Sequence, residues 1–143
     1  APRAAGPEFD PGVTIPNGGW NAPMEDLATW LGFLTGTTRG AVRADLLLSR
    51  ATLAEMGVPV VQVGRGEGVV ESMGLGFFLY DVNGHKLMGH TGDQGGFRSF
   101  MAFDPASGQG VIGVVNTSND VDPGVSGRGF TSLFRSALTL LAQ

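Results

Sequence analysis

Residues 89–105 predict a pair of antiparallel strands, and they restrict the possible folds of this chain more than any other stretch. An apolar run ends at Gly89-His90-Thr91, residues 92–96 are small or polar, and a second apolar run covers 97–103. Small residues between two such runs are typical of a tight connection between neighbouring strands. The glycines let a ligand approach the backbone closely, and the imidazole and hydroxyl groups can exchange protons with it. The sequence therefore places candidate chemistry at the end of a strand.

Composition and charge exclude several classes of protein. The 143 residues suffice for one domain with a substantial core. A net charge of −4 and the lack of any basic run argue against a nucleic-acid partner. With no cysteine and two histidines, we expect neither a disulfide framework nor a metal site. No apolar stretch reaches the length of a membrane span, and the N-terminus has no charged-then-apolar signal pattern.

The chain is expected to begin with an extended segment and to continue as one domain. Residues 1–19 contain four of the eight prolines and no hydrophobic periodicity, so we expect an extended surface segment there and a domain over 20–143. Asn21 is a candidate N-cap for a first helix, and Gly36 is its expected end. Ser49 is a candidate N-cap for a second, shorter helix.

The second half of the chain has the period of strands. Residues 64–72 and 124–129 are rich in glycine and polar residues and predict loops, whereas Asn83-Gly84 is a strong hairpin signal. The expected helices cover about 22–36, 49–56 and 128–142, and the expected strands about 73–80, 86–91, 97–103 and 110–116. Two helices, a four-strand antiparallel meander and a closing helix make an α+β fold, an antiparallel sheet flanked by helices.

Several runs, taken in order, resemble the C-terminal part of the class C β-lactamase, D-alanyl-D-alanine peptidase and esterase family of serine hydrolases. His90-Thr91-Gly92 resembles the family's third motif, which is Lys-Thr-Gly in most members, and the likeness continues to Pro105. The further matches are Gly18-Gly19, Glu25-Asp26-Leu27-Ala28, Leu47-Leu48-Ser49 through Met56, Gly74 to Phe77, and Val111 to Asn116. The resemblance implies the C-terminal portion of a β-lactamase/transpeptidase-like fold that works without a metal or cofactor.

The chain departs from the family pattern in the residues of nucleophilic catalysis. The family's nucleophile lies in a Ser-x-x-Lys motif, and no serine here has a lysine three residues later, because Lys86 is the only lysine. The only tyrosine, Tyr80, lies on a predicted strand and does not match the family's Tyr-x-Asn motif. The resemblance therefore implies that an N-terminal segment of the same protein supplies the catalytic Ser and Lys. That segment would also complete the sheet beside residues 110–116.

The family pattern also implies roles for the residues that are present. The backbone N–H of Asp93 corresponds to one of the family's two oxyanion-hole donors. His90 takes the place of the family's lysine, and Thr91 offers its hydroxyl to the substrate or to the proton network. The substrate would bind along a low edge formed by Gly92 and Gly95-Gly96.

Histidine in place of lysine changes the expected substrate. An imidazole is largely uncharged at pH 7, so a permanent cation beside the substrate is lost. Recognition of the carboxylate carried by β-lactams and peptidoglycan stems is then weaker, which favours an esterase, amidase or D-aminopeptidase. The expected reaction is acylation of serine by a small-molecule ester or amide, followed by hydrolysis. The family is often exported, which agrees with a periplasmic or secreted location, but the sequence itself leaves the compartment open.

Simpler explanations compete with these roles. His85 beside the Asn-Gly turn is most simply an exposed residue, and Arg98 a surface residue or the partner of a nearby acid. Trp20 and Trp30 are expected to pack in the core or at an interface. For the whole chain, the alternative is a non-catalytic binding or structural module derived from this fold. The missing Ser-x-x-Lys favours that alternative, and the unpaired apolar edge left by a strand at 110–116 opposes it.

Overall fold

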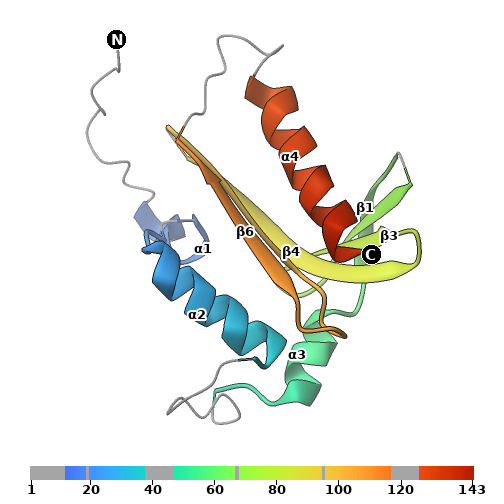
Figure 1. The fold of residues 1–143 in the computed structure, drawn as a ribbon. Helices are drawn as coiled ribbons and strands as arrows, with labels where there is room; N and C mark the ends of the chain where they lie inside the picture. The colour runs from blue at the N-terminus through green and yellow to red at the C-terminus, as the bar shows by residue number, and fades with distance from the viewer. Residues whose placement is uncertain (1–11, 19, 38–46, 67, 95, 117–125) are drawn as a thin grey trace.

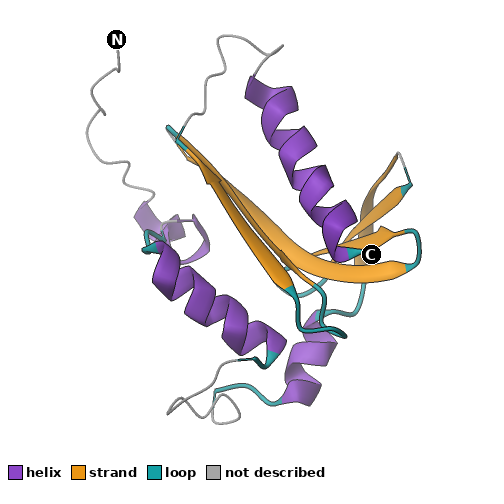
Figure 2. Cartoon of the chain, in the orientation of Figure 1, coloured by secondary structure: helices purple, strands orange, loops and turns teal. Residues whose placement is uncertain are grey.

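The protein is a three-layer arrangement in which one antiparallel sheet lies between helices (Figures 1 and 2). The computed structural model describes residues 12–18, 20–37, 47–66, 68–94, 96–116 and 126–143. Helix α4 (Ser126–Leu141) covers one face of the sheet, and helices α2 (Met24–Thr35) and α3 (Arg50–Met56) lie on the other. This architecture confirms the α+β fold class.

The sheet has six strands, and its spatial order is the chain order. All neighbouring strands are antiparallel, so the sheet is a simple meander with β1 and β6 at its edges among the described residues. The strands are β1 (Val61–Gly66), β2 (Val69–Met73), β3 (Phe78–Val82), β4 (His85–Gln94), β5 (Phe97–Phe103) and β6 (Gly110–Val115).

The prediction of a loop over residues 64–72 is wrong, because this stretch forms most of the β1–β2 hairpin. Strand β1 is almost entirely exposed and β2 is uniformly half-buried, so neither shows the alternation of a one-sided strand. A β-bulge between Gln62 and Gly64 breaks the register further. Two strands without a period of two cannot be distinguished from a loop in the sequence. The sheet therefore has six strands where four were expected.

The expected strand over 73–80 is divided by a turn. Strand β2 ends at Met73, and β3 begins only at Phe78. A Cβ at Gly74 would lie 2.2 Å from the Met56 carbonyl oxygen, so the chain passes directly against the end of α3. Gly76 has φ +77°, a conformation that favours glycine. Both glycines are therefore required by the turn.

Of the three expected residues at helix ends, Gly36 and Ser49 act as predicted and Asn21 does not. Helix α2 begins at Met24, and Pro23 occupies the N-cap position without a side-chain hydrogen bond, so Asn21, two residues earlier, does not cap the helix. Gly36 ends α2 in the left-handed conformation, as expected. Helix α3 begins at Arg50 and is capped by Ser49, whose Oγ accepts a hydrogen bond from the Thr52 N–H at 3.0 Å.

Two further segments differ from expectation. Part of the expected extended segment is helical, in a 3-10 turn (Gly12–Thr14) and the four-residue α1 (Ile15–Gly18). Helix α4 begins at Ser126 and so includes most of the glycine-rich stretch predicted as a loop. The apolar stripe of this helix, which includes Phe134 and Leu138, packs on the sheet, and the helix extends N-terminal to that stripe through the glycine-rich residues.

Two hydrophobic clusters fix the helices to the two faces of the sheet. Side chains alternate along the strands, so Leu87 and Ala102 belong to one cluster and Met88 and Phe103 to the other. The cluster under α4 contains Tyr80, Val82, Leu87, Phe100, Ala102, Phe134, Ala137, Leu138 and Leu141. The cluster under α2 and α3 contains Phe33, Leu34, Phe77, Leu79, Met88 and Phe103.

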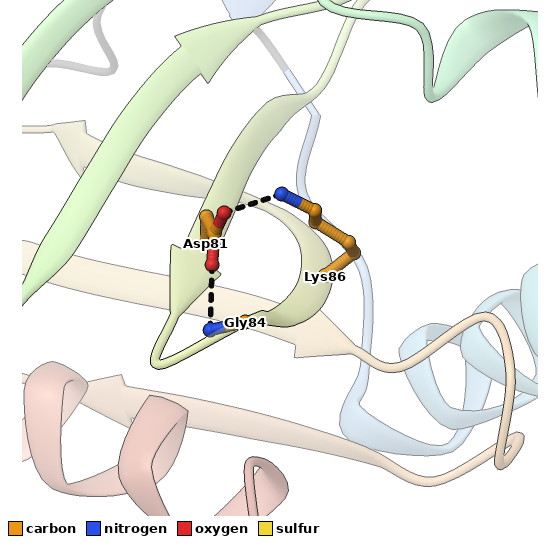
Figure 3. A network of polar contacts seen from close by, with 3 residues as sticks. All are labelled: Asp81, Gly84 and Lys86. Atoms are coloured by element: carbon orange, nitrogen blue, oxygen red, sulfur yellow. Dashed lines mark hydrogen bonds and ion pairs between the residues drawn. The ribbon is translucent and has the colours of Figure 1, made fainter.

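The β3–β4 hairpin carries a compact polar network (Figure 3). Asn83 and Gly84 both have positive φ, at 53° and 91°, as the turn type that the Asn-Gly pair predicts requires. The Asp81 carboxylate accepts hydrogen bonds from the Lys86 ammonium and from the Gly84 N–H. The bond from Lys86 and then the bond from Gly84 hold the pKa of Asp81 below its usual range.

The hairpin network predicts an acid-dependent loss of stability. Because the pKa of Asp81 is lowered in the folded state, its contribution is present above the pKa of the unfolded chain. It is lost as the pH falls through the lowered native pKa. In Asp81→Asn the free energy of unfolding should fall less between about pH 5 and about pH 2 than in the parent chain.

Urea unfolding at a series of pH values measures this difference. Glu55→Gln, which removes a carboxylate from exposed α3, is the matched control and should keep the parent slope. Parallel pH profiles for Asp81→Asn and the parent chain would contradict the assignment.

Candidate active-site wall on strand β4

Strand β4 has an open edge in its second half. It pairs with β3 only as far as Gly89, opposite Phe78, but with β5 as far as Gln94, opposite Phe97. Within the described part of the chain, the segment His90–Gln94 is therefore hydrogen-bonded to a neighbouring strand on one side only. Such an edge presents backbone N–H and C=O groups that can pair with an extended ligand.

His90 is exposed at the point where this edge opens. Its Nδ1 lies 2.6 Å from the carbonyl oxygen of Thr91. A carbonyl oxygen only accepts, so Nδ1 donates this hydrogen bond, and Nε2 of the neutral ring is left as the acceptor. The ring of Phe78 lies 5.2 Å from the imidazole, centroid to centroid, and supports it from β3. This arrangement gives His90 a defined tautomer that can accept a proton.

The residues after His90 keep the edge narrow. Thr91 is half-buried opposite Phe100, and Gly92 lies opposite Ser99. A Cβ at Gly92 would lie 2.7 Å from the Ser99 Oγ, so any larger residue would displace that hydroxyl. Gly96 has φ +99° with open space around it, as the reversal into β5 requires. The adjoining Gly95 lies outside the described residues.

Asp93 and Arg98 hold the two strands together near the tip of the hairpin. The Arg98 Nε donates to the Asp93 Oδ2 at 2.8 Å, and the two residues are direct cross-strand partners. The Arg98 side chain is only 15% exposed. The expectation that Arg98 pairs with a nearby acid is confirmed, and the pair fixes the backbone of Asp93 relative to β5.

The other singled-out side chains lie elsewhere. His85 is exposed at the hairpin end of β4, five residues from His90. Tyr80 is buried edge-on against Phe134, with ring centroids 5.4 Å apart. Burial and then the negative charge of Glu71 raise the pKa of Tyr80, so its hydroxyl stays protonated. None of these groups joins the β4 edge.

Both tryptophans are more exposed than core residues. Trp20 is 78% exposed, and Trp30 of α2 is 40% exposed. A core position is therefore wrong for both. The described residues contain no group of three or more His, Cys, Asp or Glu side chains that could hold a metal ion. No helix in the described ranges is long and apolar enough to cross a membrane.

Comparison with known families identifies the family of the chain. The β-lactamase family model matches residues 1–132 of the chain. The chain belongs to the β-lactamase family. Most members of this β-lactamase-like group are hydrolases, and the match covers every element from α1 through β6. No curated protein gives a significant match.

A solved structure supports the same fold. The chain is similar to the octameric penicillin-binding protein homologue from Pyrococcus abyssi, with 24% sequence identity and a TM-score of 0.53. The match covers 66% of this chain and 20% of that protein, so this chain spans about a fifth of the length of its solved neighbour.

The open edge of β4 was not predicted from the sequence. A strand over 73–80 would have had partners along β4 further than Gly89, and only the turn at residues 74–77 leaves the edge free. The sequence feature that indicates the turn is Gly74-Leu75-Gly76, because glycines within a strand pattern weaken the strand.

Gly89 sets the position of His90, and its replacement tests this. A Cβ at Gly89 would lie 2.3 Å from the Met101 carbonyl oxygen and 3.1 Å from the Ala102 Cα, both on the neighbouring backbone. Gly89→Ala must push β4 away from β5, and we expect a loss of about 1–3 kcal/mol in the free energy of unfolding. Denaturant unfolding measures the loss.

Gly66→Ala is the matched control, because nothing lies within 4 Å of a Cβ built at that strand position. We expect its stability to stay within about 0.5 kcal/mol of the parent chain. Equal effects of the two substitutions would show that the close approach at Gly89 does not constrain the strands.

Proposed function

We propose that this chain forms one wall of the active site of a serine hydrolase of the β-lactamase-like family. The observation that supports the proposal most directly is the open edge His90–Gln94, which begins at an exposed imidazole whose Nε2 is free to accept a proton. A substrate lying along this edge has its reacting carbonyl beside backbone donors and a base. The nucleophile would come from a segment that carries Ser-x-x-Lys.

The proposed reaction is acyl transfer through serine. The serine Oγ attacks the carbonyl carbon of an ester or amide, and its proton passes to the Lys and His90 network. The Asp93 N–H donates one hydrogen bond to the negatively charged oxygen that develops, and the serine N–H donates the second. The leaving alcohol or amine takes up the proton. Water then attacks the acyl-enzyme and releases the acid.

The charges near the edge favour substrates without a carboxylate. His90 replaces a permanent cation, and the only lysine, Lys86, is bound to Asp81 at the opposite hairpin. Arg98 is bound to Asp93, so its charge is partly neutralised. We therefore propose esters and amides without a carboxylate as the preferred class, with β-lactams and peptidoglycan stem peptides, which carry one, as slower substrates.

The same partner segment would cover the β6 edge. Within the described residues strand β6 pairs only with β5, and Val114 of β6 is 45% exposed. An apolar edge of this kind invites another strand. We propose that the polypeptide that brings the serine also pairs with β6, which makes assembly and activity depend on each other.

The first test is the composition and reactivity of the native material. We expect its native mass to include a polypeptide or segment with Ser-x-x-Lys, and a fluorophosphonate probe to label that serine. A folded, monomeric 14.8 kDa chain that no serine-reactive probe labels would instead support the alternative, a non-catalytic binding or structural module.

Substitution of the two histidines tests the role of the β4 edge. In the native, serine-containing protein, His90→Ala should lower kcat/KM for p-nitrophenyl butyrate by about 100-fold or more, because a positioned proton acceptor is lost. His85→Ala, which removes the other, exposed histidine from the hairpin end of the same strand, should retain full activity. Equal activities of the two variants would exclude His90 from the chemistry.

A further inference from the structure

One face of strand β4 has a gap in its side chains directly beyond His90. Side chains alternate along a strand, and Met88 belongs to the cluster under α2 and α3, so His90 and Gly92 lie on that same face. Gly92 is exposed and has no side chain, and it follows His90 by about 6.6 Å along the strand. The backbone of the open edge is therefore accessible from this face at Gly92.

The hydroxyl of Ser99 occupies part of this gap from the neighbouring strand β5. Ser99 is the direct cross-strand partner of Gly92, and it shares its face of the sheet with Phe103, which belongs to the same cluster. The Ser99 Oγ lies 2.7 Å from the point where a Cβ of Gly92 would be. A hydroxyl from β5 therefore stands beside the backbone of the open edge, on the face that also carries His90.

The Ser99 hydroxyl is available to a ligand. The residue is half-buried, and within the part of the chain that the structure describes its hydroxyl makes no hydrogen bond. The hydroxyls of Ser49 and Ser107, by contrast, each accept a hydrogen bond from a nearby backbone N–H. A half-buried hydroxyl that has lost part of its water gains stability from a new partner, and it can donate one hydrogen bond.

We propose that Ser99 determines specificity at the β4 edge, where its hydroxyl donates a hydrogen bond to an acceptor atom in the leaving group of the substrate. The inference rests on the proposed function, in which the reacting carbonyl lies beside the Asp93 N–H and His90 belongs to the network that returns a proton to the leaving group. The leaving group then extends from Asp93 toward His90. Gly92 lies between these two residues, so the leaving group passes the Ser99 hydroxyl.

The chemistry of the group decides which leaving groups fit. An ester has no N–H or O–H at its reacting end, so Ser99 can bond to such a substrate only as the donor. The preferred class is therefore esters and amides whose leaving group carries an ether or carbonyl oxygen close to the reacting bond. A leaving group that is purely hydrocarbon leaves the Ser99 hydroxyl without a partner, and it is disfavoured for that reason.

A matched pair of esters isolates this hydrogen bond in the native, serine-containing protein. The leaving groups of 2-methoxyethyl butyrate and butyl butyrate have nearly the same size, and both esters form the same acyl-enzyme. In Ser99→Ala we expect the ratio of their kcat/KM values to fall by about 3–10-fold, as for the loss of one neutral hydrogen bond. Ser99→Thr retains a hydroxyl and should retain the parent ratio. An unchanged ratio in Ser99→Ala would overturn the inference.

Ser72→Ala is the matched control for this measurement. Ser72 of β2 is also half-buried, and its partner Leu79 places it on the same face of the sheet, but it lies two strands away from β4. We expect Ser72→Ala to keep the parent ratio. A fall equal to that in Ser99→Ala would assign the effect to a general change in the sheet, and it would overturn a specific role for Ser99.

A second measurement tests the contact between Ser99 and Gly92 without any substrate. In Gly92→Ala the new methyl group must displace the Ser99 hydroxyl, so the urea midpoint of unfolding should fall. In the Ser99→Ala background the hydroxyl is gone, and the same substitution at Gly92 should lower the midpoint less. Equal effects of Gly92→Ala in the two backgrounds would exclude the close approach on which the inference depends.

The failure of this inference and that of the proposed function are distinguishable. Labelling of a Ser-x-x-Lys serine by the fluorophosphonate probe, with an unchanged ester ratio in Ser99→Ala, retains the hydrolase and rejects the role of Ser99. A protein that hydrolyses neither ester and carries no labelled serine rejects the proposed function, and this inference with it. Labelling of Ser99 itself would make Ser99 the nucleophile and would reject its role in specificity.

Discussion

The turn at residues 74–77 is the constraint on which the candidate site depends. Gly74 passes within contact distance of the end of α3, and Gly76 takes a conformation that other residues avoid. The turn delays the start of β3 until Phe78, and β3 therefore ends its pairing with β4 at Gly89. The one-sided pairing of His90–Gln94 follows from this shortening.

The two hydrophobic clusters hold the strands that form the candidate site in fixed positions. Strands β4 and β5 contribute to both clusters because their side chains alternate between the faces of the sheet. The close contact at Gly89 brings their backbones together immediately before His90. Packing therefore fixes the backbone from which the imidazole extends, and the ring itself contacts the Thr91 carbonyl and the Phe78 ring.

The parts of the fold that follow a simple rule could be predicted from the sequence. The Asn83-Gly84 turn, the Ser49 cap, the Gly36 end and strand β5 each depend on local chemistry that the residues themselves specify. The β1–β2 hairpin could not be predicted, because both its faces are similarly exposed and no period of two arises. The order of the motifs could indicate the β-lactamase family, but the open edge arises from pairing between distant segments.

Because β3 begins only at Phe78, the β4–β5 hairpin projects as an arm whose outer half carries His90 and Asp93 on one strand. The Asp93–Arg98 pair ties the two strands of this arm together. A change in the twist of the arm would therefore move His90 and Asp93, the proposed proton acceptor and oxyanion donor, together as one body. Alignment with the nucleophile of the proposed partner segment would then require a single rigid-body adjustment instead of two independent ones.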